Sequence, residues 1–148
     1  MATYDPDIEK NFPHIKQEGY DVTSPIDPGY NCIAWAAGEN NLWYWPDPLS
    51  IYYWPNNIAR ECTLNAFIEL YQSLGYEICS EQNVEADFEK IAIYVDSNNI
   101  PLHAARQLES GTWTSKLGPY KDIEHNTIRG LENSAYGKLG VVLRRKKS

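Results

Sequence analysis

The spacing of hydrophobic positions changes near the middle of the chain. From residue 63 to residue 74, apolar side chains recur every three or four positions, at Leu64, Phe67, Ile68, Tyr71 and Leu74. This spacing predicts an amphipathic helix that packs on a core and ends at Gly75. After residue 75 the spacing falls to two, which is typical of strands. Helices followed by a run of strands predict an α+β fold.

Several later segments have the alternation of half-buried strands. The clearest is KIAIYV at 90–95, where Ile91, Ile93 and Val95 alternate with smaller or more polar neighbours. We expect further strands at YEIC, LHAARQL, TWTSKL and KLGVVLRR. The turn sequences DSNN and ESG join three of these segments into an antiparallel meander. Residues 122–137 predict a loop with one helical turn.

The first part of the chain lacks a sustained period. Residues 1–29 are rich in Pro, Gly and Asp, which predicts an irregular N-terminal segment. Asn31 suits a helix N-cap, so we expect a short helix that starts at Cys32 and stops at Gly38. Residues 41–57 hold three tryptophans, three tyrosines and three prolines, which predict a long aromatic loop.

Composition narrows the class of protein. The 148 residues are 43% hydrophobic and 22% charged, which suits one globular domain over residues 1–148. We expect the basic residues 144–148 to form a solvated tail. Thirteen Lys and Arg against 20 Asp and Glu give a net charge of −7, so nucleic acid is not expected as a partner.

The chain shows neither a membrane span nor a secretion signal, which predicts a cytoplasmic protein without membrane contact. Cys32, Cys62 and Cys79 are odd in number, widely spaced and without C-x-x-C spacing. This pattern argues against a disulfide framework and against a structural zinc site. We therefore expect no metal and no cofactor, and the sequence leaves the oligomeric state open.

Cys32 and His103 are the candidates for chemistry. The thiolate is the nucleophilic form of cysteine, and a helix start is one of the few settings that lower a thiol pKa. Such a nucleophile needs a base within hydrogen-bond reach and a polar group that orients the base. On its predicted strand His103 shares a face with Ala105 and Gln107, where the alanine leaves room for a ligand. A packed cysteine and a structural histidine are the simpler interpretations of each residue alone.

The aromatic loop has two interpretations. Trp43, Trp45 and Trp54 suit a platform for a sugar ring or an extended peptide, and they equally suit a roof over the core. Lys116 is expected in a surface ion pair. Arg106 should lie on the strand face opposite His103.

Several motifs carry a resemblance. The strings YNCIAWAAG, EKIAIYV, HAARQL, WTSKLG and DIEH resemble an uncharacterised family of small bacterial proteins, mostly cyanobacterial. More distantly, a cysteine at a helix start followed by strands with an early histidine is similar to papain-like cysteine peptidases. That group includes cell-wall amidopeptidases and toxins that deamidate or cleave host proteins. The resemblance implies a papain-like α+β domain.

This resemblance also implies roles for individual residues. Cys32 matches the nucleophile and His103 the general base. In papain-like enzymes the third catalytic residue, which orients the base, comes from the next strand or the loop after it. The candidates in this region are Ser115, Asp122, Glu124 and His125. We choose Asp122, because a carboxylate fixes the tautomer of the imidazole and stabilises its charged form.

The glutamine that completes the oxyanion hole of papain-like enzymes is missing just before the cysteine. The expected substitute is the Cys32 backbone N–H together with the side chain of Asn31 or Tyr30. The residues expected to contact substrate are Trp43, Trp45, Trp54, Gln107 and Ser115.

These residues support more than one function. The first is a cysteine-dependent hydrolase or acyl transferase, acting on an amide bond of a peptide, a protein or a peptidoglycan-like substrate as a peptidase, amidase or deamidase. The alternative is a catalytically inactive papain-like protein that binds a partner through its tryptophan loop. A third interpretation, an immunity or antitoxin partner, rests on the acidic charge alone.

Overall fold

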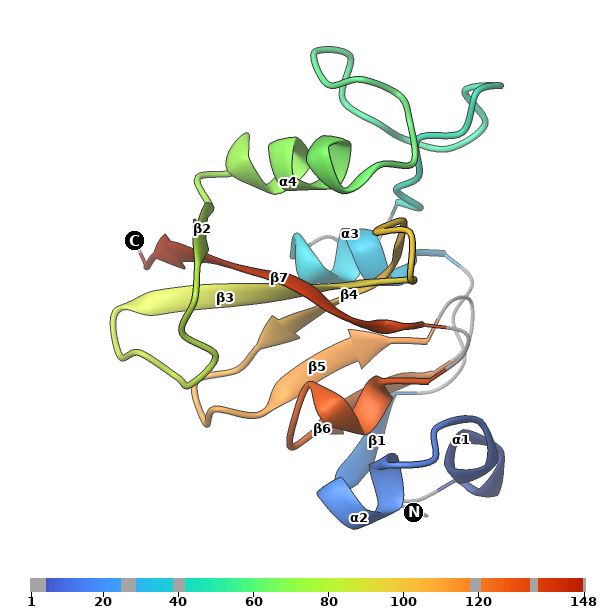
Figure 1. The fold of residues 1–148 in the computed structure, drawn as a ribbon, viewed down its shortest axis with the longest axis vertical. Coiled ribbons are helices and arrows are strands. Elements are labelled where there is room, and N and C mark those ends of the chain that lie inside the picture. Colours follow the sequence, from blue (N-terminus) through green and yellow to red (C-terminus); the bar gives the residue numbers. More distant parts are fainter. Residues whose placement is uncertain (1–4, 25–28, 39–41, 118–120, 134–135, 148) are drawn as a thin grey trace.

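The computed structural model describes residues 5–24, 29–38, 42–117, 121–133 and 136–147. Within these residues, seven strands form one antiparallel sheet in the order β1-β6-β5-β4-β3-β7-β2 (Figure 1). The strands are β1 (Tyr20–Ser24), β2 (Glu77–Cys79), β3 (Phe88–Val95), β4 (Pro101–Gln107), β5 (Trp113–Lys116), β6 (Asp122–His125) and β7 (Lys138–Lys146). The helices are α1 (Pro6–Asn11), α2 (Ile15–Glu18), α3 (Cys32–Ala36) and α4 (Leu64–Gln72), with a 3₁₀ turn at Arg129–Leu131. The expected α+β class is confirmed.

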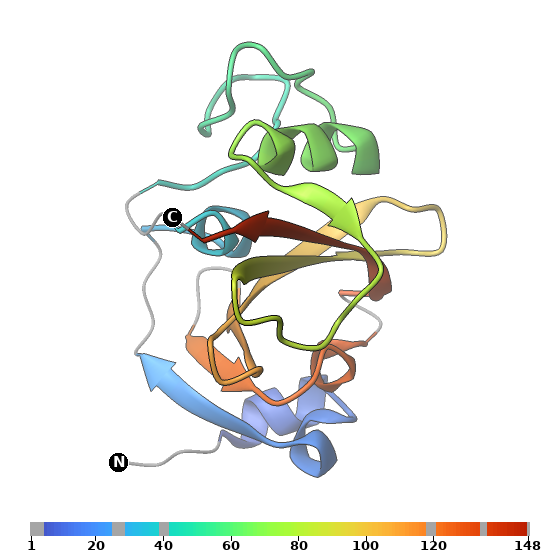
Figure 2. The same cartoon turned by 90° about the vertical axis from the view of Figure 1, so that its left-hand side faces the viewer.

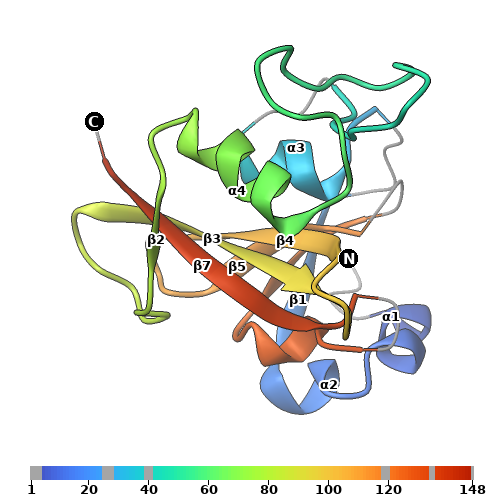
Figure 3. The same ribbon diagram turned by 45° about the horizontal axis from the view of Figure 1, so that its top comes forward.

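Helices cover both faces of the sheet. α3 and α4 lie on one face, and α1, α2 and the 3₁₀ turn lie on the other (Figures 1 and 3). Alternate residues of β3 serve the two sides: Ile91 and Ile93 belong to the core under α3 and α4, and Ala92 and Tyr94 to the opposite core. The two-residue spacing seen in the sequence therefore marks a sheet that is buried on both faces.

The predicted helices α3 and α4 form where their caps indicate. The Asn31 side chain accepts from the Ala34 N–H at 3.1 Å, and the Thr63 side chain accepts from the Ala66 N–H at 3.2 Å. Between these helices, residues 42–57 lack regular helix or strand, as expected of the aromatic loop, and the irregular segment continues to residue 63. It projects beyond α4 at one end of the molecule (Figure 2). The residues that flank Cys32 are thus positioned by local capping and by a loop without regular structure.

The N-terminal segment differs from its prediction. Within residues 1–29, which we expected to be irregular, the structure has α1, α2 and β1. Asp5 caps α1 by accepting from the Asp7 N–H at 2.9 Å, with a proline at the start of the helix. Ile8 and Ile15 are buried in the second core. The turn-rich composition reflects caps and helix stops, because Pro and Asp are as typical of helix starts as of loops.

Residues 122–125 were expected in a loop, and the basic residues from 144 onward were expected both to end the KLGVVLRR strand and to form a tail. Residues 122–125 form β6, which pairs with both β1 and β5. Arg144, Arg145 and Lys146 belong to β7, between β3 and β2. Glu85 binds Arg144 at 2.9 Å, and Glu89 binds Arg145. Because acidic partners compensate these charges, a basic stretch lies within the sheet and does not form a solvated tail.

No helix in the described part of the chain combines the length and the apolarity needed to cross a membrane.

Candidate functional site

Cys32 lies at the first position of α3, beside a pocket. The pocket has a volume of about 340 Å³ and is lined by Asn31, Cys32, Trp43, Trp45, Tyr52, Leu102 and Tyr136. The Cys32 side chain itself is 6% exposed and packs in the core under α3 and α4. The thiol therefore combines burial with an adjacent cavity of ligand size.

The electrostatics at Cys32 oppose the expected activation. Burial raises the pKa of the thiol to about 11, and this effect exceeds the stabilising influence of the backbone N–H groups of Ala104, Ile33 and Cys32 itself and of the Lys116 ammonium. The helix is five residues long, so its dipole is small beside the desolvation of the sulfur. At neutral pH the resting side chain is a thiol, surrounded by donors that would stabilise a thiolate once it forms.

His103 is held by a chain of hydrogen bonds that crosses three strands. Its Nε2 lies 3.0 Å from Ser115 Oγ on β5, and the same hydroxyl lies 2.8 Å from His125 Nε2 on β6. His125 Nδ1 in turn lies 2.8 Å from the Thr127 carbonyl oxygen. All three side chains in this relay, His103, Ser115 and His125, are fully buried.

The end of the relay determines every proton in it. A carbonyl oxygen accepts, so His125 Nδ1 carries a hydrogen, and its Nε2 is an acceptor when the ring is neutral. Ser115 then donates to His125 and accepts from His103, which places the hydrogen of His103 on Nε2. His103 Nδ1 is left as a bare lone pair, and it is buried without a hydrogen-bond partner. The relay thus presents one nitrogen of His103 as a base.

Both imidazoles are neutral, as this assignment requires. Burial lowers the pKa of His125 to about 4. Burial, together with the neighbouring His125, lowers the pKa of His103 well below its usual 6.5. The relay is therefore uncharged at neutral pH, and its tautomers are fixed by hydrogen bonds.

Tyr136 connects the histidine to the pocket. Its ring stacks on the His103 imidazole at 4.2 Å with an interplanar angle of 8°, and it also lines the pocket beside Cys32. No hydrogen bond links Cys32 Sγ to His103 Nδ1 among the described residues. The register between β3 and β4 shifts next to Leu102, and from His103 onward the alternation is regular. His103 contacts the Tyr94 ring in the core under α1 and α2, whereas Ala104 lies in the core with Cys32 under α3, so His103 and Cys32 belong to opposite faces of the sheet.

Asp122 lies elsewhere than the expected triad requires. Its Oδ2 accepts from the Tyr30 hydroxyl at 2.5 Å, whereas Ser115 occupies the hydrogen-bonding position at His103. Asp122 pairs in register with Lys116, whose ammonium lies 4.9 Å from the centre of the Tyr30 ring. Lys116 is fully buried, which differs from the expected surface ion pair. This cluster ties the segment before α3 to the sheet.

The two side chains expected as oxyanion donors are committed to other contacts. The Tyr30 hydroxyl donates to Asp122, and the Asn31 amide donates to the Tyr44 carbonyl oxygen at 2.6 Å. The backbone N–H groups of Ile33 and Ala104 lie close enough to stabilise charge at the sulfur, and backbone donors of this kind serve as oxyanion holes.

The residues expected to contact substrate divide into two groups. Trp43 and Trp45 line the pocket. Trp54 is buried against Phe67 at 5.2 Å and donates to the Ala59 carbonyl oxygen, so it serves the core. The Gln107 amide donates to two loop carbonyl oxygens away from the pocket. Ser115 belongs to the histidine relay.

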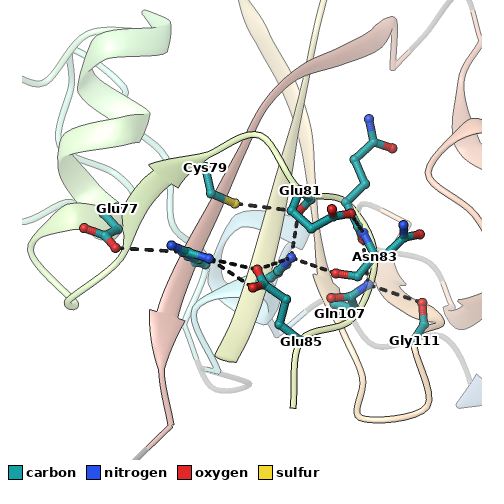
Figure 4. A network of polar contacts seen from close by, with 10 residues as sticks. Glu77, Cys79, Glu81, Asn83, Glu85, Gln107 and Gly111 are labelled. Atoms are coloured by element: carbon teal, nitrogen blue, oxygen red, sulfur yellow. Dashed lines mark hydrogen bonds and ion pairs between the residues drawn. The ribbon is translucent and has the colours of Figure 1, made fainter. Parts of the chain in front are cut away.

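Gln107 is part of a separate polar network that holds the loop after β2 (Figure 4). The fully buried Lys90 ammonium binds Glu85 at 2.8 Å and the carbonyl oxygens of Glu81 and Asn83 at 2.7 Å each. Arg144 binds the same Glu85. Every donor of the Lys90 ammonium has an acceptor, which identifies this network as structural.

Sequence reasoning missed three residues of the pocket: Tyr52, Leu102 and Tyr136. A signal for Tyr136 is the glycine that follows it. Gly137 has a φ of +74°, and a Cβ there would lie 1.9 Å from the Val95 carbonyl oxygen. The chain can approach β3 at this point because residue 137 lacks a side chain.

Among the described residues, no group of three His, Cys, Asp or Glu side chains could hold a metal ion.

Comparison with protein families shows which family the chain belongs to. Neither the curated proteins nor the solved structures contain a match to the chain. A family described as a domain of unknown function, DUF7689, matches residues 21–144, a range that includes Cys32, His103, Ser115 and His125. The chain belongs to the DUF7689 family.

Proposed function

We propose that this chain is a cysteine-dependent hydrolase or acyl transferase that acts on an amide bond, with Cys32 as nucleophile on a papain-like scaffold. The observation that carries the proposal is the unpartnered Nδ1 of His103, oriented as a base by a buried relay and covered by a tyrosine of the Cys32 pocket. A buried imidazole nitrogen without a partner costs free energy, and sites that retain such a cost are often functional.

The proposed reaction starts from neutral groups. As Cys32 Sγ attacks the carbonyl carbon, its proton passes to His103 Nδ1, and the carbonyl oxygen takes up the negative charge. The imidazolium then donates this proton to the leaving amine as the C–N bond breaks. Water or an acceptor amine next attacks the thioester, losing a proton to Nδ1, and the thiol leaves with that proton.

The relay suits this cycle because its hydrogen bonds need not change. His103 Nε2 keeps its hydrogen in both the imidazole and the imidazolium form, so Ser115 Oγ accepts from it throughout. Because His103 and Cys32 belong to opposite faces of the sheet, the proton transfer requires a rearrangement at this end of β4 that brings Sγ and Nδ1 within hydrogen-bond distance when substrate binds. Ser115 with His125 thus replaces Asp122 as the orienting group in this proposal.

Acylation of Cys32 by an activated ester tests the proposal. Wild type, Cys32→Ala, His103→Gln and His14→Gln are incubated with p-nitrophenyl acetate, and acylated cysteines are located by peptide mapping. We expect acylation of Cys32 in wild type and in His14→Gln, and a loss of about 100-fold in rate in His103→Gln, the size of a general-base contribution. An unreactive Cys32, or equal rates with and without His103 in folded protein, contradicts the proposal.

The binding-protein alternative keeps one observation in its favour. The pKa of the Cys32 thiol is raised to about 11 by burial, and a ligand-binding cysteine needs no ionisation. In that case the pocket still binds a peptide or similar partner, and Cys32 is not acylated. The described cysteines are all free, which fits action in a reducing compartment such as the cytoplasm for either function.

A further inference from the structure

We propose that the pocket beside Cys32 selects an uncharged, apolar side chain on the acyl side of the amide, such as that of leucine, methionine or phenylalanine. The position of this side chain on the acyl side of the scissile bond rests on the proposed function. The selectivity itself rests on the walls of the pocket.

Among the residues that the structure describes, the pocket wall carries no charged side chain. Five of the lining residues are aromatic or aliphatic: Trp43, Trp45, Tyr52, Leu102 and Tyr136. The pocket volume of about 340 Å³ lies at the small end of ligand sites, which span roughly 300–1,000 Å³. A charged group placed here would lose its hydration without gaining an opposite charge.

The side-chain amide in the wall, that of Asn31, is already satisfied. Its Oδ1 accepts from the Ala34 and Tyr44 N–H groups at 3.1 Å each, and its Nδ2 donates to the Tyr44 carbonyl oxygen. This amide cannot bind a polar substrate group without giving up the cap of α3. The Lys116 ammonium influences the Cys32 thiol, but it packs over Tyr30 and pairs in register with Asp122. The pocket therefore offers no counter-charge for an anionic side chain.

The aromatic wall is held in place before any ligand arrives. Trp45 packs edge-on against Phe67 at 5.5 Å, and Trp43 lies 5.8 Å from the Tyr52 ring. The Asp47 carboxylate accepts from the Tyr52 N–H at 3.0 Å and from the Ile51 N–H at 2.8 Å. A preorganised wall binds an apolar group without the cost of ordering a loop.

The apolar surface continues outside the pocket. Tyr52 is 41% exposed, and its neighbours in the loop, Ile51 and Leu49, are 68% and 78% exposed. Exposed aliphatic residues next to an apolar pocket are typical of a binding surface. The loop that supplies Tyr52 to the pocket thus also exposes aliphatic side chains to solvent.

Turnover of matched amides tests the inference. The substrates are N-acetyl-aminoacyl coumarin amides of leucine and aspartate, which have similar shapes, and of methionine and lysine, which have similar lengths. We expect kcat/KM to favour leucine over aspartate and methionine over lysine by at least about tenfold, as hydrophobic pockets discriminate. Tyr52→Ala should reduce the preference several-fold. Tyr53→Ala is the matched control, because Tyr53 is 44% exposed in the same loop and lies outside the pocket.

Binding to Cys32→Ala separates this inference from the proposed function. Intrinsic tryptophan fluorescence is titrated with the N-acetyl amino acid amides of leucine, aspartate and lysine. If wild type cleaves no amide but this variant binds the leucine amide more tightly than the charged ones, the proposed function fails and the selectivity stands. If wild type cleaves charged substrates as well as apolar ones, the selectivity is overturned and the proposed function stands. Failure of the variant to bind the leucine amide, or equal binding of the charged amides, also overturns the selectivity.

Discussion

Replacing Ser115 with alanine tests the histidine relay directly. The substitution removes an acceptor 3.0 Å from His103 Nε2 and a donor 2.8 Å from His125 Nε2, in a site that is fully buried. Each buried polar atom left without a partner costs about 1–3 kcal/mol, so Ser115→Ala, which leaves two such atoms, should lower the free energy of unfolding by about 2–6 kcal/mol. With a urea m-value of about 2 kcal/mol per molar, the unfolding midpoint should fall by about 1–3 M.

A matched variant on the same strand is the control for stability. Thr114→Val keeps the side-chain shape and removes an acceptor of the Trp35 indole N–H, at 3.1 Å, on the opposite face of β5. We expect this variant to lose about 1 kcal/mol and to leave both histidines unchanged. A loss in Ser115→Ala no greater than that in Thr114→Val would refute the two-sided role of the hydroxyl.

The tautomers provide the more specific test. Long-range ¹H–¹⁵N correlation spectra at pH 7 should show His103 protonated at Nε2 and His125 protonated at Nδ1. In Ser115→Ala the His125 assignment should persist, because the Thr127 carbonyl oxygen fixes it, and His103 should become a mixture of tautomers. A wild-type His103 protonated at Nδ1 would contradict the orientation on which the proposed catalysis depends.

Three further outcomes follow from buried groups. Native Cys32 should react with iodoacetamide with a half-maximal rate near pH 11, against about 8.5 in urea-unfolded chain, and a native value at or below 8.5 would contradict the burial effect. Because burial lowers the pKa of His125 to about 4, the unfolded chain binds more protons than the folded chain between pH 6.5 and pH 4. The free energy of unfolding, measured in urea, should therefore fall by about 3 kcal/mol or more as the pH is lowered through this range. His125→Asn should reduce this dependence on pH. Lys90→Met should destabilise the fold by about 2–4 kcal/mol and speed amide exchange in residues 81–85, whereas Lys147→Met, which breaks an exposed pair with Glu109, should change stability by less than about 0.5 kcal/mol.

Local signals predicted the elements that depend on neighbouring residues. The Asn31 cap and the stop at Gly38 delimit α3, and the three-to-four spacing after Thr63 delimits α4. These patterns succeed because capping and amphipathicity act over a few residues. β6 was missed because four residues are too few to show a period, and because one of its two partners, β1, comes from a segment about 100 residues earlier in the chain, so this pairing leaves no local signal.

The candidate site was predicted in part for the same reason. The residue types and positions of Cys32 and His103 could be predicted from the sequence. In the structure Tyr136 lines the pocket beside Cys32 and stacks on the His103 ring. The third member was chosen by chemical type, and a carboxylate is the usual choice. In the structure Asp122 accepts a hydrogen bond from Tyr30 and does not contact His103, because Asp122 and Ser115 point to opposite faces of neighbouring strands.

By itself the sequence determined the class of fold, the start of the helix at Cys32 and the strand that carries His103, because each depends on patterns within a few residues. The tertiary structure decided the environment of these groups. It buried the thiol, which raises its pKa to about 11, it placed Ser115 and His125 where they orient His103, and it lined the pocket with residues from four separated segments. Ionisation and tautomers depend on which groups the fold brings into contact and how far it excludes water, and those quantities are set by packing across the sheet.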